Sequence, residues 1–244
     1  LSLRRQRQMC IRDRHQRGNV FMAKSVTFID TEVGVDDHKI HDIGAIRQDR
    51  ASFHAANIRE FAAFVEGTEY ICGHNILHHD LKYLQNALGY ELPAIKIDTL
   101  YLSPLLFPKR PYHALLKDDK LQSDQLNDPV NDCKKAATLF YDEVNAFFEL
   151  PSKVKQIFCC LLYDHPEFHG FFRYVNFRPY HVNVPELIRA EYEGQICSNA
   201  ELLPLIRHYP VELAYALALV GAKDEHSITP PWLMRNCLLY TSPS

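Results

Sequence analysis

Two carboxylates separated by one residue, Asp30 and Glu32, are the first feature of the sequence that could do chemistry. They stand at the end of residues 26–30, a short β-branched and aromatic run that predicts a buried strand. Residues i and i+2 of a strand point to the same face, and two carboxylates held that close repel each other unless a cation lies between them. Such oxygen-rich sites suit Mg²⁺ or Mn²⁺, although the same pattern is also common in ordinary turns.

Two further acids lie near the expected beginnings of helices. Asp80 follows a Gly-His-Asn turn at 73–75, and Asp132 lies early in the helix predicted over 129–148. Either acid could simply complement the positive end of a helix dipole. A zinc site built on His78 and His79 is not favoured, because adjacent side chains on a helix diverge by roughly 100°.

Three motifs occur in chain order around these acids: FIDTE at 28–32, GHNILHHDLKYL at 73–84 and LNDPVNDCKKA at 126–136. The strings HDIGAI, KIDTLYLSPLLFP and YHALL lie between them. Over about 25–149 the chain resembles the DEDD superfamily of 3′–5′ exonucleases, the DnaQ-like branch of the ribonuclease H-like fold. The resemblance implies a site for two Mg²⁺ or Mn²⁺ ions, with the ligands Asp30, Glu32, Asp80 and Asp132.

The activity that this resemblance implies is hydrolysis of phosphodiester bonds at the 3′ end of a nucleic acid, in DNA repair or recombination. Single-stranded DNA is expected in preference to RNA. Two metal ions about 3.5–4 Å apart would activate a water and neutralise charge in the transition state. The residues that we expect to contact the nucleic acid are Thr31, His74, Asn75, Lys134 and Lys135.

The sequence departs from the family's pattern at the general base. One branch of the family has histidine five residues before the last aspartate, where this chain has Asn127, and the other has tyrosine at the place of Asp128. A neutral asparagine orients a water but does not take its proton. His113 or a metal-bound hydroxide could replace the base. The alternative function is therefore a catalytically weakened, nuclease-derived module that binds nucleic acid.

Basic residues gather over 109–135, where they could form a path for phosphates. They are Lys109, Arg110, Lys117, Lys120, Lys134 and Lys135. Four aspartates interrupt this series, so a solvated surface is an equally good interpretation.

The elements that must position the acids alternate along the chain. Strands are expected over 26–30, 39–47, 51–55, 69–72 and 96–100, and helices over 57–65, 79–88 and 129–148. This alternation predicts an α/β fold, and the resemblance makes it a ribonuclease H-like mixed sheet flanked by helices. The following segment is predicted to be a mainly helical extension, with helical spacing over 184–190, 200–206 and 211–220, and a strand is considered over 171–177.

Composition bounds the class of protein. The 244 residues are 47% hydrophobic, which excludes a disordered chain, and no run approaches the roughly 18–20 apolar residues of a membrane span. Seven cysteines without a C-x-x-C pair argue against a disulfide framework and favour the cytoplasm. We expect no membrane partner. Residues 22–244 carry 21 basic and 29 acidic side chains, so phosphate binding needs a local basic surface.

Four segments are expected along the chain. The strings at 9–14 and 237–244 resemble translated sequencing-adapter fragments, so 1–21 and 237–244 are interpreted as non-native tails. Residues 22–149 form the exonuclease-like domain. Residues 150–236 form a helical extension or a linker toward a helicase motor, because 22–236 resembles the amino-terminal part of a RecQ-like DNA helicase with a fused exonuclease. The sequence has no G-x-x-x-x-G-K-[ST], so that motor is not in this chain.

Overall fold

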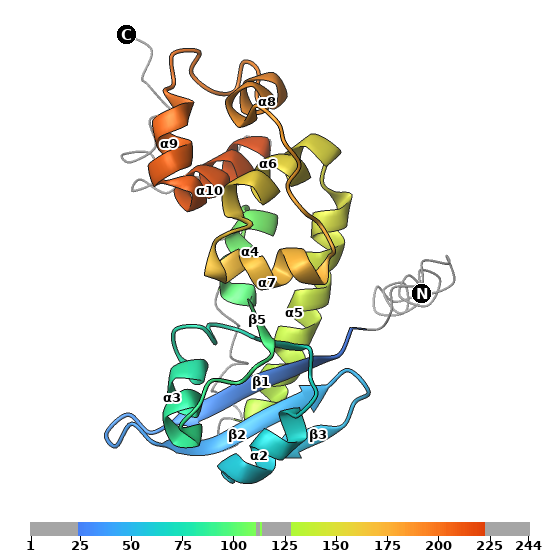
Figure 1. The fold of residues 1–244 in the computed structure, drawn as a ribbon, viewed down its shortest axis with the longest axis vertical. Coiled ribbons are helices and arrows are strands. Elements are labelled where there is room, and N and C mark those ends of the chain that lie inside the picture. Colours follow the sequence, from blue (N-terminus) through green and yellow to red (C-terminus); the bar gives the residue numbers. More distant parts are fainter. Residues whose placement is uncertain (1–23, 111–112, 114–127, 223–244) are drawn as a thin grey trace.

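A five-stranded mixed sheet (Figure 1) includes the strand of Asp30 and Glu32, whereas Asp80 and Asp132 lie in the first turns of helices. The computed structural model describes residues 24–110, 113 and 128–222. Across the sheet the order is β3 (Ser52–His54), β2 (Ile40–Arg47), β1 (Val26–Val33), β4 (Tyr70–Gly73) and β5 (Ile95–Asp98). β2 runs antiparallel to β1 and β3, whereas β1, β4 and β5 are parallel. The predicted α/β class with a mixed sheet is confirmed.

Helices cover both faces of the sheet, and the alternation of strand side chains decides which helix each face meets. Ile29, Ile43 and Ile71 pack in one buried cluster with α2 (Ile58–Val65) and α3 (Asp80–Leu88). Side chains from the opposite face of the sheet belong to a second cluster with α4 (Thr99–Leu106) and α5 (Pro129–Glu149); they include Val26, Phe28, Tyr70 and Cys72. The two acids of β1 share the face of Phe28, so they point toward the side of α5.

Local signals set the helix ends as the sequence predicts. The Asn57 side chain accepts hydrogen bonds from the first turn of α2, and Gly89 ends α3 in the left-handed conformation that glycine adopts without strain. The Asp128 side chain caps α5 by accepting from the N–H of Val130, and Pro129 fills the first helical position. The helices expected over 57–65, 79–88 and 129–148 are therefore confirmed.

A helical region follows the sheet and confirms the predicted mainly helical extension. It comprises α6 (Ser152–Leu162), α7 (Pro166–Tyr174), α8 (Val184–Glu191), α9 (Leu202–His208) and α10 (Pro210–Gly221). The strand considered over 171–177 is wrong, because α7 occupies most of that segment. Phe168, Phe171 and Phe172 recur at helical spacing and are all buried. The boundary expected at 149/150 falls where α5 ends.

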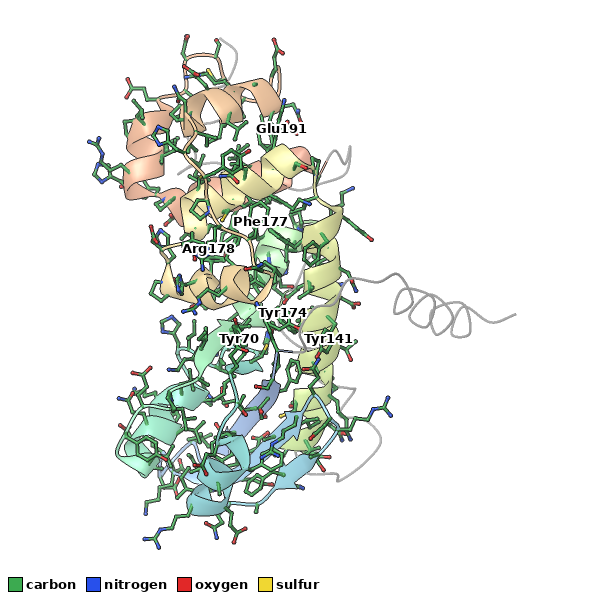
Figure 2. All side chains as sticks on the ribbon, turned by 45° about the vertical axis from the view of Figure 1, so that its right-hand side comes forward. Tyr70, Tyr141, Tyr174, Phe177, Arg178 and Glu191 are labelled. Carbon is green, nitrogen blue, oxygen red and sulfur yellow. The ribbon has the colours of Figure 1, made fainter. Side chains whose placement is uncertain are left out.

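The helical region packs directly on the end of the sheet. Tyr174 of α7 stacks edge-to-face on Tyr70 of β4 and on Phe140 of α5, with ring centroids 5.4 and 4.9 Å apart. Figure 2 shows Tyr70, Tyr141 and Tyr174 gathered at this junction. Phe147, near the end of α5, contacts Phe171 of α7 at 5.4 Å. One buried cluster thus continues from the sheet into the helices.

Within the described ranges, no helix combines the length and the apolar character that a membrane span requires. The tails expected over 1–21 and 237–244 lie outside the described residues.

Candidate metal centre

Three of the four predicted ligands converge at one point. Asp30 and Glu32 come from β1 and Asp132 from the first turn of α5, and each offers a carboxylate oxygen within 4.8 Å of the others. β1 continues beyond its pairing with β4, which ends at Phe28 opposite Cys72. The two acids therefore extend past the parallel part of the sheet, and the amino-terminal end of α5 lies on the same side. All three side chains are half-buried.

Asp80 lies next to this group but is not one of the three. Its side chain is buried, with 2% exposed, and its Oδ1 accepts hydrogen bonds from both the N–H and the hydroxyl of Thr31, each at 2.7 Å. Thr31 is the residue between Asp30 and Glu32, so its side chain points to the opposite face of β1. Asp80 is thereby linked to the acidic group through the strand that carries it.

Cationic and polar neighbours offset part of the negative charge. The Lys135 Nζ lies 3.3 Å from the Asp132 Oδ1, and the His79 Nδ1 lies 3.6 Å from the Asp80 Oδ2. The interaction with the Asp80 carboxylate raises the pKa of His79 above its usual value, and the charges of Asp30 and Glu32 add to this effect. Burial raises the pKa of the Cys133 thiol well above its usual range, with further contributions from Asp30, Asp80 and Asp132.

The donor set fits a hard divalent cation. Three carboxylate oxygens at one point are the ligands that Mg²⁺ and Mn²⁺ take, and their mutual repulsion favours a cation between them. Among the residues that the structure describes, this is the one group of three or more potential ligands within such reach of one another. His78 and His79 are not among these ligands; the His78 ring packs on Tyr101 and the His79 ring on Tyr83.

Asp98 anchors the loop that leads to Asp80, and sequence reasoning missed it. This fully buried side chain accepts hydrogen bonds from the N–H groups of Asn75, Leu77 and Leu100, at 2.7, 3.1 and 3.0 Å. It therefore holds the loop and caps α4 at the same time. Asn75 adopts a left-handed φ of 65° there. The available signal was an acid directly before a Thr-Leu helix start.

His74 is held by the same loop. Its Nδ1 lies 2.8 Å from the Thr99 Oγ1, and burial, followed by the nearby His113, lowers its pKa to about 4. His74 is therefore neutral near pH 7. The contacts of His74 and Asn75 position the loop, and their contact with nucleic acid stays a prediction.

The residues considered as a general base are only partly placed. His113 lies against α4 with its Nδ1 3.2 Å from the Ser103 Oγ, and burial, followed by Arg110, lowers its pKa. His113 is thus neutral near pH 7 and able to accept a proton. Asn127 lies outside the described residues.

The predicted basic path is also only partly placed. Lys135 pairs with Asp132, so it faces the acids, and the Lys134 Nζ donates to the Asn131 Oδ1 at 3.3 Å. The Arg110 guanidinium stacks on Phe107 at 3.9 Å from the ring centroid. Lys117 and Lys120 lie outside the described residues. A path for phosphates along 109–135 stays a prediction.

Comparisons of this chain with protein-family models, with curated proteins and with solved structures find no match.

Proposed function

We propose that the protein is a metal-dependent 3′–5′ exonuclease that hydrolyses phosphodiester bonds at the ends of single-stranded DNA. The observation that carries the proposal is the meeting of Asp30, Glu32 and Asp132, which are distant in sequence, at one half-buried point. The resemblance of the three ordered motifs to DEDD exonucleases supports the same activity. The site would hold Mg²⁺ or Mn²⁺, and the bound ions would supply an activated water and neutralise charge on the phosphate.

Each residue of the site has a separate role in this proposal. Asp30, Glu32 and Asp132 would hold the cations, and Asp80 would contribute the carboxylate oxygen that Thr31 does not engage. Thr31 keeps the Asp80 side chain oriented through its two hydrogen bonds. Lys135, which pairs with Asp132, would be available to a phosphate oxygen once bound cations neutralised that carboxylate. His113, which burial keeps neutral, is the candidate to accept the proton of the attacking water.

The test is cleavage of single-stranded DNA and RNA oligonucleotides labelled at the 5′ end or at the 3′ end. Each is incubated with the full chain and Mg²⁺, Mn²⁺ or chelator. A 3′–5′ exonuclease shortens the 5′-labelled oligonucleotide stepwise and releases the 3′ label at once as a mononucleotide. Asp132→Asn should abolish both signals, whereas Asp142→Asn, an exposed acid on the same helix, should leave them unchanged.

Other outcomes would redirect the proposal. Cleavage of RNA alone would change the substrate class. Binding of oligonucleotides without cleavage in any metal would replace the exonuclease by the nucleic-acid-binding module, the reading that Asn127 in place of a family base favours. Neither binding nor cleavage would refute both readings.

A further inference from the structure

Gly44 lies at the closest approach between the sheet and α5. It pairs with Asp30 across the β1–β2 ladder. An ideal Cβ placed on Gly44 would lie 2.4 Å from the carbonyl carbon of Pro129 and 2.6 Å from the nitrogen of Val130. These are backbone atoms of the first turn of α5, and such atoms cannot rotate out of the way. Any other residue at 44 must therefore lift the start of the helix from the strand.

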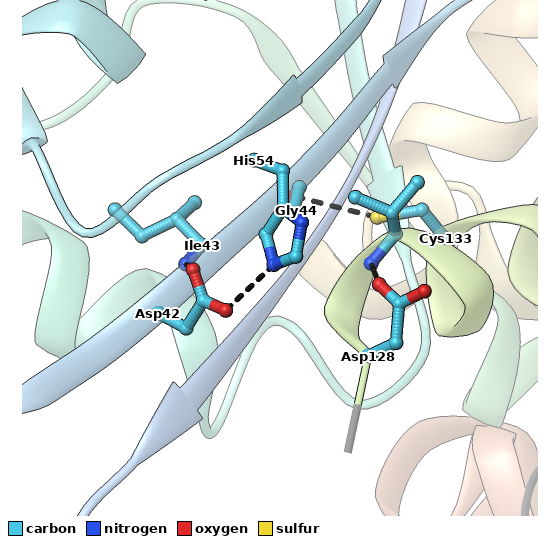
Figure 3. Close-up of polar contacts among 7 residues, drawn as sticks. Asp42, Ile43, Gly44, His54, Asp128 and Cys133 are labelled. Atoms are coloured by element: carbon cyan, nitrogen blue, oxygen red, sulfur yellow. Dashed lines mark hydrogen bonds and ion pairs between the residues drawn. The ribbon is translucent and has the colours of Figure 1, made fainter. Parts of the chain in front are cut away.

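A second contact joins α5 to β2 at the same place. The Cys133 thiol donates a hydrogen bond to the Gly44 carbonyl at 3.3 Å, and Cys133 is fully buried. Figure 3 shows this bond beside the Asp128 cap that begins the helix. Asp132 is the residue directly before Cys133. The position of Asp132 relative to β1 is therefore set by the backbone of Gly44 on one side and by the Cys133 thiol on the other.

We propose that Gly44 is a positioning residue for the acidic site: its missing side chain lets α5 approach β2 closely enough for Asp132 to reach Asp30 and Glu32. This inference rests on the proposed metal-dependent function. An ordinary van der Waals contact to the Pro129 carbon needs about 3.4 Å, so a methyl group would displace the helix start by about 1 Å. Mg²⁺ ligands lie at only about 2.0–2.1 Å from the ion, and a displacement of that size removes Asp132 from the ligand set.

The experiment measures Mn²⁺ binding to the full chain by electron paramagnetic resonance, which counts free Mn²⁺ without reference to activity. Gly44→Ala should weaken binding by at least 10-fold, the usual effect of disturbing the residues that support metal ligands. The matched control is Gly221→Ala in α10. It adds the same methyl group away from the sheet, where its Cβ would meet the Tyr192 ring at 3.4 Å, and should leave Mn²⁺ affinity unchanged. Equal affinity of Gly44→Ala and the wild type would overturn the inference.

A second pair of variants decides the matter if Gly44→Ala does not fold. Cys133→Ser keeps a donor for the Gly44 carbonyl, whereas Cys133→Val replaces it with a larger apolar group. The serine variant should bind Mn²⁺ like the wild type and the valine variant at least 10-fold more weakly. Equal Mn²⁺ affinities of the serine and valine variants would contradict the positioning role.

A measurement in chelator separates this inference from the proposed function. If the wild type binds no Mn²⁺, the metal-dependent function fails, and the closeness of the carboxylates is tested alone. The shifts in melting temperature of Asp30→Asn, Asp132→Asn and the double variant should then be non-additive in the wild type and additive in the Gly44→Ala background. Equal non-additivity in both backgrounds would refute the positioning role.

Discussion

Replacing Asp30 by asparagine is expected to stabilise the metal-free protein. Asp30 shares the site with Glu32 and Asp132, with oxygens within 4.8 Å. Two unit charges at that distance repel by about 0.9 kcal/mol in water and about 3.5 kcal/mol at an effective dielectric constant of 20. The site is half-buried and Lys135 offsets part of its charge, so the lower part of this range applies to the two pairs that Asp30 makes. We expect the free energy of unfolding to rise by about 1–2 kcal/mol.

Thermal unfolding in chelator and in Mn²⁺ checks this expectation. In chelator, Asp30→Asn should melt about 2–8 °C above the wild type, since each kcal/mol shifts the midpoint by about 2–4 °C in a chain of this size. Saturating Mn²⁺ should then stabilise only the wild type, by about 2.7 kcal/mol at 100 times its dissociation constant. Asp142→Asn is the control and should change neither the melting temperature in chelator nor its shift in Mn²⁺. The reasoning is refuted if Asp30→Asn melts no higher in chelator and keeps the full Mn²⁺ shift.

The remaining predictions concern Thr31, Glu143 and the two candidate positions for the general base, His113 and Asn127. Thr31→Val removes a buried hydrogen bond to the Asp80 carboxylate and should cost about 1.5–3 kcal/mol of unfolding free energy, while Thr31→Ser keeps most of it; equal urea midpoints for the two variants would contradict this. Burial raises the pKa of Glu143 well above its usual value. With respect to this group, the folded state is therefore most stable below the unfolded pKa of about 4.5, where the carboxyl is protonated, and it loses that stability as pH rises through the folded pKa. Glu143→Gln should therefore gain melting temperature over the wild type from pH 5 to pH 8, and a constant difference would count against it. If His113 is the base, His113→Ala should abolish cleavage and Asn127→His should change little. If a metal-bound hydroxide serves instead, cleavage by the wild type should rise with pH and be faster in Mn²⁺ than in Mg²⁺. The cleavage rate of Asn127→His should then follow a titration near pH 6.5, the usual pKa of histidine.

Most of the fold follows from local sequence patterns, and the exceptions have a physical cause. The strands and the helices α2, α3 and α5 carry both periodicity and end signals, so they could be predicted, but the strand expected over 96–100 was placed too far along the chain, because β5 ends at Asp98 and α4 begins at Thr99. α4 was missed because its sequence contains Pro104, which normally interrupts a helix. Burial of Leu102, Leu105 and Leu106 in the core stabilises the helix despite the proline. The aromatic composition of 171–177 suggested a strand, but burial of Phe171 and Phe172 in the core stabilises a helix there.

The candidate site, too, could be predicted from the sequence only in part. The common direction of Asp30 and Glu32 follows from strand alternation alone. The approach of Asp132 depends on the packing of α5 on β2 at Gly44, a contact between residues far apart in sequence. The engagement of Asp80 by Thr31 likewise depends on the path of the loop that Asp98 holds. Such long-range contacts leave no local periodicity, so the sequence names the acids without showing which three of them meet.

The buried cluster shared by the sheet and the helical region makes the two parts one cooperative unit. Phe147 and Phe140 of α5 are covered by α7, so undocking the helices would expose aromatic surface on the helix that carries Asp132. That exposure costs several kcal/mol, at about 25 cal/mol per Å² of apolar surface. The buried amides in the middle of α5 should consequently exchange through an opening of the same free energy as those of α6 and α7. Residues 150–222 thus stabilise, through aromatic packing, the helix that carries Asp132.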